Sequence, residues 1–148
     1  MFFIISEAEL EYALNKPPAP NLIPPKYLTT TKDIDKYIKL IKSHNIKVGL
    51  AINPNTWLFR IKKYLNQVDM IIVMGVYAGF GGQEFIPKTI KRLKKLNTFG
   101  RKYILSLDGG VNKEIIDQVK DYIDIAVVGS YITASDNYEK QIKNITEM

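Results

Sequence analysis

Residues 70–85 read MIIVMGVYAGFGGQEF, an apolar run that leads directly into a segment rich in glycine. The run Met70–Met74 has the length and the continuous apolar character of a strand buried on both faces. Glycines directly after a strand leave backbone N–H groups accessible, and phosphorylated ligands bind at this end of strands in α/β proteins. The stretch therefore predicts a parallel sheet with a phosphate-binding edge.

Two further apolar runs also end in small residues. Residues 105–110 read LSLDGG and residues 125–130 read IAVVGS. Apolar runs alternate along the chain with segments of helical period, which is the pattern of parallel strands joined by crossover helices. The sequence predicts an α/β fold with strands at residues 2–5, 47–52, 70–74, 103–107 and 125–128. Helices are expected at about residues 7–14, 31–44, 57–66, 87–96, 113–122 and 137–145.

Five prolines fall within residues 16–27, which predicts a long irregular loop rather than a boundary between domains. At 148 residues the chain has the size of one domain with its own core, so residues 1–148 are interpreted as a single domain. No apolar run approaches the roughly 20 residues of a membrane span, and no cysteine is present. These features predict a cytoplasmic protein without a membrane partner.

The formal net charge of +6 raises the question of nucleic-acid binding. Seven basic residues and no acidic residue lie within residues 85–102, but Ile86, Ile90 and Leu93 recur there at helical spacing. The basic residues are therefore interpreted as the solvated face of a helix whose apolar stripe is buried. Aromatic residues are not interleaved with them as base stacking requires, so no nucleic-acid partner is expected.

Taken together, the motifs resemble those of the ribulose-phosphate 3-epimerase family, whose fold is a (β/α)8 barrel of the ribulose-phosphate-binding class. The matching segments are residues 49–56 (GLAINPNT), 68–74 (VDMIIVM), 79–87 (GFGGQEFIP), 108–112 (DGGVN) and 127–130 (VVGS). Five segments in the right order are a far more specific signal than any one glycine loop. The resemblance runs from about Lys47 to the C-terminus and extends weakly to residues 3–8, which look like the family's fourth strand.

The resemblance implies a partial barrel of the TIM type, with about five parallel strands and flanking helices. It also implies the family's reaction, which interconverts ribulose 5-phosphate and xylulose 5-phosphate in the pentose phosphate pathway by proton transfer at C3. In the family two aspartates act on opposite faces of the sugar, and two histidines and two aspartates hold a divalent metal, expected to be zinc, manganese or iron. Asp108 matches the aspartate that is both catalytic residue and metal ligand. The other aspartate and both histidines belong to strands that this sequence lacks.

By the same resemblance, phosphate contacts are expected from small residues of three strand-end turns: Gly79, Gly81, Gly82, Gly109, Gly110, Gly129 and Ser130. Met74 and Asn53 are expected to line the pocket, and Gly75 stands where the family usually has serine or threonine. Each residue also has a plain structural interpretation, since Asp-Gly pairs form turns, glycine permits a positive φ, and a strand-end methionine is commonly core. The single histidine, His44, is interpreted as a favourable charge at a helix end rather than a metal ligand.

Five strands taken from a closed barrel leave an open apolar face and two free edges. Three coverings stay open, namely the proline-rich segment, a second copy of the chain or a separate chain with the missing strands, and self-association is favoured. Two functions stay open as well. The chain is an epimerase acting on a small phosphosugar, or a phosphosugar-binding or interaction protein that has lost catalysis, because one aspartate cannot serve both faces of a carbon.

Overall fold

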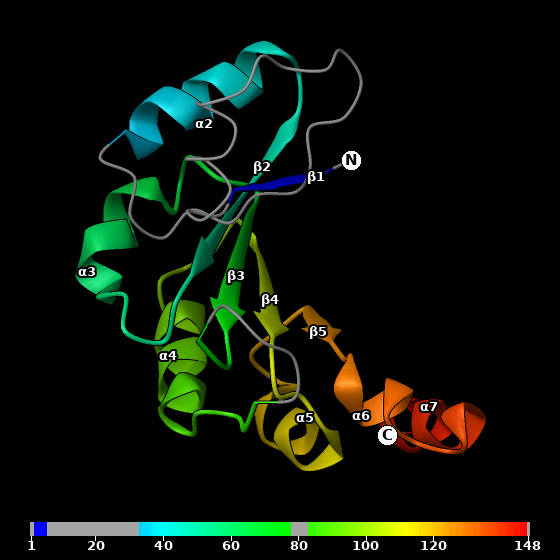
Figure 1. Cartoon of the computed structure of the whole chain (residues 1–148). Coiled ribbons are helices and arrows are strands. Elements are labelled where there is room, and N and C mark those ends of the chain that lie inside the picture. Colours follow the sequence, from blue (N-terminus) through cyan, green and yellow to red (C-terminus); the bar gives the residue numbers. More distant parts are fainter. Residues whose placement is uncertain (1, 6–32, 78–82, 148) are drawn as a thin grey trace.

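The computed structural model describes residues 2–5, 33–77 and 83–147, with residues 2–5 described as backbone only. All the strands in these ranges form one parallel sheet in the order β1-β2-β3-β4-β5 (Figure 1). The bounds are β1 (Phe2–Ile5), β2 (Lys47–Ile52), β3 (Met70–Met74), β4 (Ile104–Asp108) and β5 (Ile125–Val127). The predicted α/β class with five parallel strands is confirmed, and the expected bounds of the second and third strands match those observed.

Helices follow the strands as the sequence predicts, with two differences. The bounds are α2 (Ile34–Ser43), α3 (Leu58–Ile61), the 3-10 helix η1 (Lys62–Tyr64), α4 (Lys88–Asn97), α5 (Lys113–Val119), α6 (Ser130–Thr133) and α7 (Tyr138–Thr146). The helix expected at residues 57–66 is split into α3 and η1, and α6 was not predicted. The helix expected at residues 7–14 and the proline-rich loop at residues 16–27 lie outside the described residues.

Local sequence signals set several helix ends. Asn45 adopts φ 56° just after α2, as expected of a residue that stops a helix in the left-handed conformation. Pro87 precedes α4 with φ −59°, the value that its ring imposes. Asn112 and Asn137 cap α5 and α7, because their side-chain oxygens accept the N–H groups of Ile115 and Lys140, both at 2.9 Å. These short caps fix where each helix leaves the sheet.

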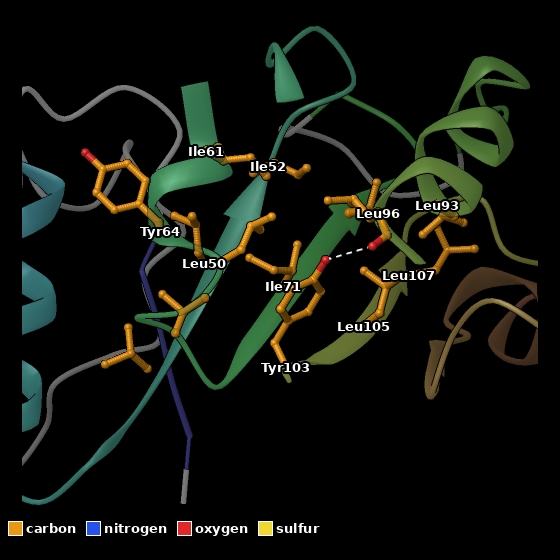
Figure 2. Packing of buried hydrophobic residues seen from close by; sticks show 14 of the residues in the cluster. Leu50, Ile52, Ile61, Tyr64, Ile71, Leu93, Leu96, Tyr103, Leu105 and Leu107 are labelled. Atoms are coloured by element: carbon orange, nitrogen blue, oxygen red, sulfur yellow. Dashed lines mark hydrogen bonds between the residues drawn. The ribbon is translucent and has the colours of Figure 1, made fainter. Parts of the chain in front are cut away.

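The main hydrophobic core lies between the sheet and the helices that cover one of its faces (Figure 2). Alternate strand residues point into it, and α4 adds Leu93 and Leu96, both with no exposed surface. The Tyr103 hydroxyl reaches this core and donates to the carbonyl oxygen of Leu96 at 3.0 Å. The cluster members from the strands are Val48, Leu50, Ile52, Ile71, Val73, Leu105 and Leu107.

The opposite face of the sheet carries a smaller cluster. Ala51, Met70 and Ile72 are buried there, with Met74 and Ile104 packed against them. Register pairs Ala51 with Ile72, Ile72 with Ser106, and Ser106 with Ile125, so these four positions form one row across four strands. This face corresponds to the inside of a barrel, and we call it the inner face.

Two aspartates fix strand register at the amino edge of the sheet. Asp69 directly precedes β3, and its carboxylate accepts the N–H of Val48 in β2 at 2.7 Å while its own N–H donates to the Val48 carbonyl at 2.8 Å. Asp124 directly precedes β5 and makes the same two bonds to Leu105 of β4, again at 2.7 and 2.8 Å. The same pair of hydrogen bonds therefore fixes the register of β2 with β3 and of β4 with β5, at the edge of the sheet away from the glycine turns.

Candidate active site

Strand register brings three predicted site positions together at the carboxyl edge of the sheet. Met74 pairs with Asp108, and Asp108 pairs with Val127, which was not a predicted site residue. Met74, Asp108 and Val127 therefore share one row of the inner face. Asn53 follows Ile52, which pairs with Val73, and so Asn53 continues this row beyond the end of β2. Asp108, Met74 and Asn53 thus lie on neighbouring strand ends, and their role in lining a common pocket stays a prediction.

Asp108 has the electrostatic setting of a proton-transfer group. Its carboxylate is half-buried, and burial raises the pKa of Asp108 above the ordinary aspartate value, although a hydrogen bond from the Gly109 N–H partly opposes this shift. No cation is paired with it among the ion pairs of the described residues. A carboxylate with a raised pKa is a better proton acceptor than an exposed one, which suits general acid–base work.

The turn after Asp108 needs glycine for reasons of backbone geometry. Gly109 and Gly110 have φ values of 100° and 67°, the region that side chains disfavour. A Cβ on Gly110 would lie 2.8 Å from the backbone nitrogen of Phe85, and one on Gly109 would lie 2.6 Å from the Val76 side chain. The chain that returns from the glycine-rich loop therefore packs directly on this turn.

Gly75 extends the same close packing. A Cβ at this position would clash with the carbonyl oxygen of Gly109 and would lie 2.7 Å from the Phe85 ring. The Gly75 N–H donates to the Asp108 carbonyl at 2.6 Å, and the Gly75 carbonyl accepts the Ile86 N–H at 2.8 Å. Glycine at this position thus permits the close approach of the ends of β3 and β4.

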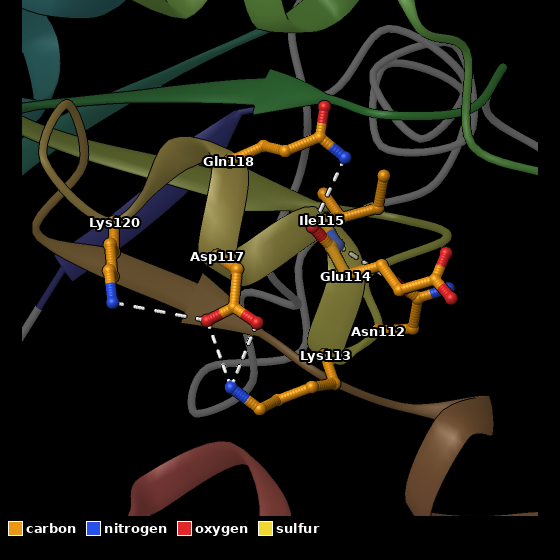
Figure 3. A network of polar contacts seen from close by, with 7 residues as sticks. All are labelled: Asn112, Lys113, Glu114, Ile115, Asp117, Gln118 and Lys120. Carbon is orange, nitrogen blue, oxygen red and sulfur yellow. Dashed lines mark hydrogen bonds and ion pairs between the residues drawn. The ribbon is translucent and has the colours of Figure 1, made fainter. Parts of the chain in front are cut away.

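The turn leads on into α5, whose first residues are held by polar contacts (Figure 3). Lys113 Nζ lies 2.9 Å from both carboxylate oxygens of Asp117, and Lys120 Nζ lies 3.9 Å from one of them. These contacts are exposed and contribute little to stability. Their effect is local, because they and the Asn112 cap define the start of the helix that follows Asp108.

The remaining predicted phosphate residues divide into two groups. Gly129 and Ser130 follow β5, hence lie at the same carboxyl edge as Asp108, and a Cβ at Gly129 would meet open space. The Gly129 carbonyl accepts the N–H groups of Ile132 and Thr133 at 2.9 and 3.1 Å, which starts the short helix α6. Gly79, Gly81 and Gly82 lie outside the described residues.

Sequence reasoning missed one contact at this edge. Arg92 was grouped with the solvated basic face of α4, but its guanidinium is half-buried and Nη2 donates to the Asn53 carbonyl at 3.3 Å. Burial lowers the pKa of Arg92, and the hydroxyl of Thr89, one turn earlier, is fully buried. The only signal in the sequence was an arginine beside the apolar stripe of the helix. The contact ties α4 to the turn after β2.

The donors present do not fit the family's metal site. Within residues 33–77 and 83–147 no group of three or more histidine, cysteine, aspartate or glutamate side chains is close enough to hold a metal ion. Asp108 is the only predicted ligand in that part of the chain. His44 is exposed after the end of α2 and precedes β2, so it lies toward the amino edge, opposite to Asp108. No step of the chemistry is therefore assigned to a metal. In the same residues, no helix is long and apolar enough to cross a membrane.

Sequence comparison connects these features to known proteins. The profile of the Ribulose-phosphate 3 epimerase family matches residues 20–133. The ribulose-phosphate 3-epimerase of Buchnera aphidicola subsp. Baizongia pistaciae is 36% identical over 124 residues, covering 80% of this chain and 54% of the relative. Those of Serratia marcescens and Escherichia coli K12 are 36% and 34% identical over 74% and 76% of this chain, and 55% and 52% of their own lengths. The chain thus spans about half the length of these relatives.

Structural comparison gives the fold independently. The tryptophan synthase α-subunit of Pyrococcus furiosus, in a mutant form, superposes with a TM-score of 0.62 at 18% sequence identity. The match covers 83% of this chain and 55% of that subunit. The likeness shows a common fold and no more, and it agrees with a sheet that is a part of an α/β barrel.

Proposed function

Because the chain belongs to the ribulose-phosphate 3-epimerase family, we propose that it binds a pentose phosphate at the carboxyl edge of its sheet and moves the proton at C3 of ribulose 5-phosphate. The observation that carries the proposal is the position of Asp108, half-buried on the inner face with a raised pKa, in one row with Met74 and next to Asn53. The proposal includes a cytoplasmic setting in the pentose phosphate pathway.

The phosphate group would bind at the turns after β4 and β5. Gly110 and Gly129 have no side chain to shield the backbone, and Ser130 opens α6 beside them. The sugar would then extend toward the row that contains Asp108. In this position the Asp108 carboxylate takes the proton from C3 and returns it, while the half-buried row limits the access of water.

One carboxylate accounts for only half of the family's reaction. Proton removal and return on one face of C3 exchanges hydrogen without changing configuration, and inversion needs a second group on the other face. The neighbours of Asp108 in its row, Met74 and Val127, carry no proton to give. A phosphosugar-binding protein without turnover is the second candidate, and the lack of a metal-ligand group among the described residues favours it.

The test is deuterium exchange at C3 of ribulose 5-phosphate in heavy water, followed by proton NMR, with zinc, manganese or iron added in separate samples. Wild type is compared with Asp108→Asn and with Asp117→Asn, which removes an exposed carboxylate of α5. Exchange that disappears only in Asp108→Asn supports the proposal. Binding of ribulose 5-phosphate by calorimetry without exchange would assign the binding function instead, and neither binding nor exchange would overturn both.

The basic face of α4 is not part of this proposal. Lys94 Nζ lies 5.1 Å from the Tyr122 ring centre and Lys95 Nζ lies 5.5 Å from that of Phe99, so two of its cations are engaged with aromatic faces of the same molecule. This supports the expectation that nucleic acid is not a partner. Gel-shift measurements with DNA and RNA at low salt would check this expectation, since a basic surface binds nucleic acid most tightly at low salt.

A further inference from the structure

The sheet has two free edges that point the same way. Among the described strands, β1 pairs only with β2, and β5 pairs only with β4. All pairs are parallel, so the two edge strands lie at opposite ends of the strand order and run in the same sense from one strand to the next. Free edges expose unpaired N–H and C=O groups, which take up further strands.

Among the strands whose side chains are described, β2 to β5, the exposed large apolar side chains lie on β5. Ile125 and Val127 of β5 are 39% and 44% exposed, and both belong to the inner face by register. In the same row as Ile125, the residues Ile72 and Ser106 are only 3% and 2% exposed. Burial on the inner face therefore stops at β5, and the next strand in that direction would cover it.

We propose that two copies of this chain close one barrel, with β5 of each copy pairing with β1 of the other around a twofold axis parallel to the strands. This axis joins the two unlike edges in parallel and leaves neither edge free. A twofold axis perpendicular to the sheet would join β5 to its own copy in antiparallel fashion and would leave both β1 edges open.

The closed dimer has a larger interior than an eight-stranded barrel. Two five-stranded sheets give ten strands, and barrel diameter grows with strand number. Interiors of eight-stranded barrels are just filled by side chains, so the wider barrel has room for a small ligand between the two inner faces. The carboxyl ends of all strands lie at one mouth, because every pairing is parallel.

Closure completes the chemistry of the site, and this part rests on the proposed function. The twofold axis places the inner-face Asp108 of one copy and the partner's Asp108 on opposite sides of the same mouth. One carboxylate takes the C3 proton, and the electron pair of the broken C–H bond moves toward the C2 carbonyl. The partner's Asp108, already protonated, then gives its proton to the other face of C3, so the number of protons is unchanged.

The first test is the mass of the full chain in solution by light scattering. The expected result is about twice the 16.9 kDa of one chain. Val127→Lys places a charge on the closing edge and should give monomers, whereas Ile142→Lys, at an exposed position of α7, should leave the dimer intact. A wild-type monomer would overturn the proposal, and that result would point to a separate chain with the missing strands as the covering partner.

The second test uses the absence of cysteine from the sequence, which makes every introduced thiol unique. A short bismaleimide should link two chains of the double variant Ile4→Cys with Ile125→Cys, one thiol on each proposed edge and both at inner-face positions by register. Neither single variant should be linked under the same conditions. Linked dimers from Ile125→Cys alone would show β5 paired with its own copy and would overturn the proposed closure.

The third test concerns the shared site. Wild-type and Asp108→Asn chains are mixed in equal amounts, unfolded in urea and refolded together. If both carboxylates are needed, random pairing leaves about a quarter of the epimerisation rate of the same total amount of wild type, against about half if each chain works alone. The first outcome supports the shared site and the second overturns it. A cross-linked dimer that neither exchanges nor epimerises would overturn the proposed function and leave the closure standing.

Discussion

The backbone N–H of Gly75 donates to the carbonyl oxygen of Asp108 at 2.6 Å, which ties the residue after β3 to the last residue of β4. The bond holds the two strand ends so close that neither Gly75 nor Gly109 has space for a side chain. The position of the candidate proton-transfer group is therefore fixed by backbone contacts, in addition to any contacts of its carboxylate.

The free-energy cost of crowding at the glycine turn can be measured separately from the cost of its positive φ. Gly110→Ala and Gly100→Ala both place alanine at a positive φ, 67° and 60°, but only at Gly110 would the new Cβ meet other atoms. Gly100→Ala should cost about 1 kcal/mol of unfolding free energy, from the left-handed conformation alone. Gly110→Ala should cost at least about 2 kcal/mol more, because Phe85 must move. Urea unfolding of both variants measures the difference, and equal losses would contradict the packing described.

Removing the Asp108 charge should change how stability depends on pH. Burial raises the pKa of Asp108, so the folded chain holds this proton more tightly than the unfolded chain does. The associated stability is present below the ordinary value of 3.8 and is lost as the pH rises through the raised pKa. Asp108→Asn should therefore gain stability over wild type as the pH is raised from about 4 toward 7. Urea melts across that range measure this, and a constant difference would contradict it.

Asp124 should show the opposite dependence. Burial opposes its ionisation, but the hydrogen bonds from Arg101 and from the Leu105 N–H outweigh burial, so the pKa of Asp124 is lowered. Its stabilisation is present above 3.8 and is lost as the pH falls through the lowered pKa. Asp124→Asn should cost about 1 kcal/mol at pH 7, because the carboxylate is partly exposed and screened. Asp121→Asn, at an exposed position, is the control, and an equal loss there would count against the register role of Asp124.

The buried hydroxyl of Tyr103 offers a test of the core. Its bond of 3.0 Å to the Leu96 carbonyl joins the start of β4 to the end of α4 (Figure 2). Tyr103→Phe removes the donor and should cost about 1 kcal/mol of unfolding free energy. Tyr138→Phe removes the hydroxyl of an exposed tyrosine and should be close to neutral. Thermal and urea unfolding compare the two, and no loss in Tyr103→Phe would mean that water replaces the bond.

The strands could be predicted from sequence because they are buried on both faces. Continuous apolar runs mark such strands, and residues 47–52 and 70–74 were bounded correctly for this reason. The parallel direction of the strands follows from their alternation with helices, and the common edge of Asp108, Met74 and Asn53 follows from parallel pairing. Asn45 and Pro87 stand at helix ends and are signals that can be read locally, because their backbone preferences do not depend on distant residues.

Contacts between distant segments could not be predicted. The bond from Arg92 to Asn53 joins residues 39 positions apart, and an arginine next to an apolar stripe gives no sign of its partner. The same holds for Asp69 with Val48 and for Asp124 with Leu105, since an aspartate before a strand is also a common turn residue. The lack of space for a side chain at Gly75 likewise depends on Gly109 and Phe85, which are distant in sequence.

Asp69 and Asp124 hold the strand register at the amino edge of the sheet, whereas Asp108 lies at the carboxyl edge. Asp69 and Asp124 act as stops that prevent β2 from sliding along β3, and β4 along β5, each through bonds of 2.7 and 2.8 Å. A slip of one residue would turn Asp108 from the inner face to the core. The alignment of the candidate site is thus held by groups at the opposite edge of the sheet, so the offset between the strands does not depend on the loops beside the substrate.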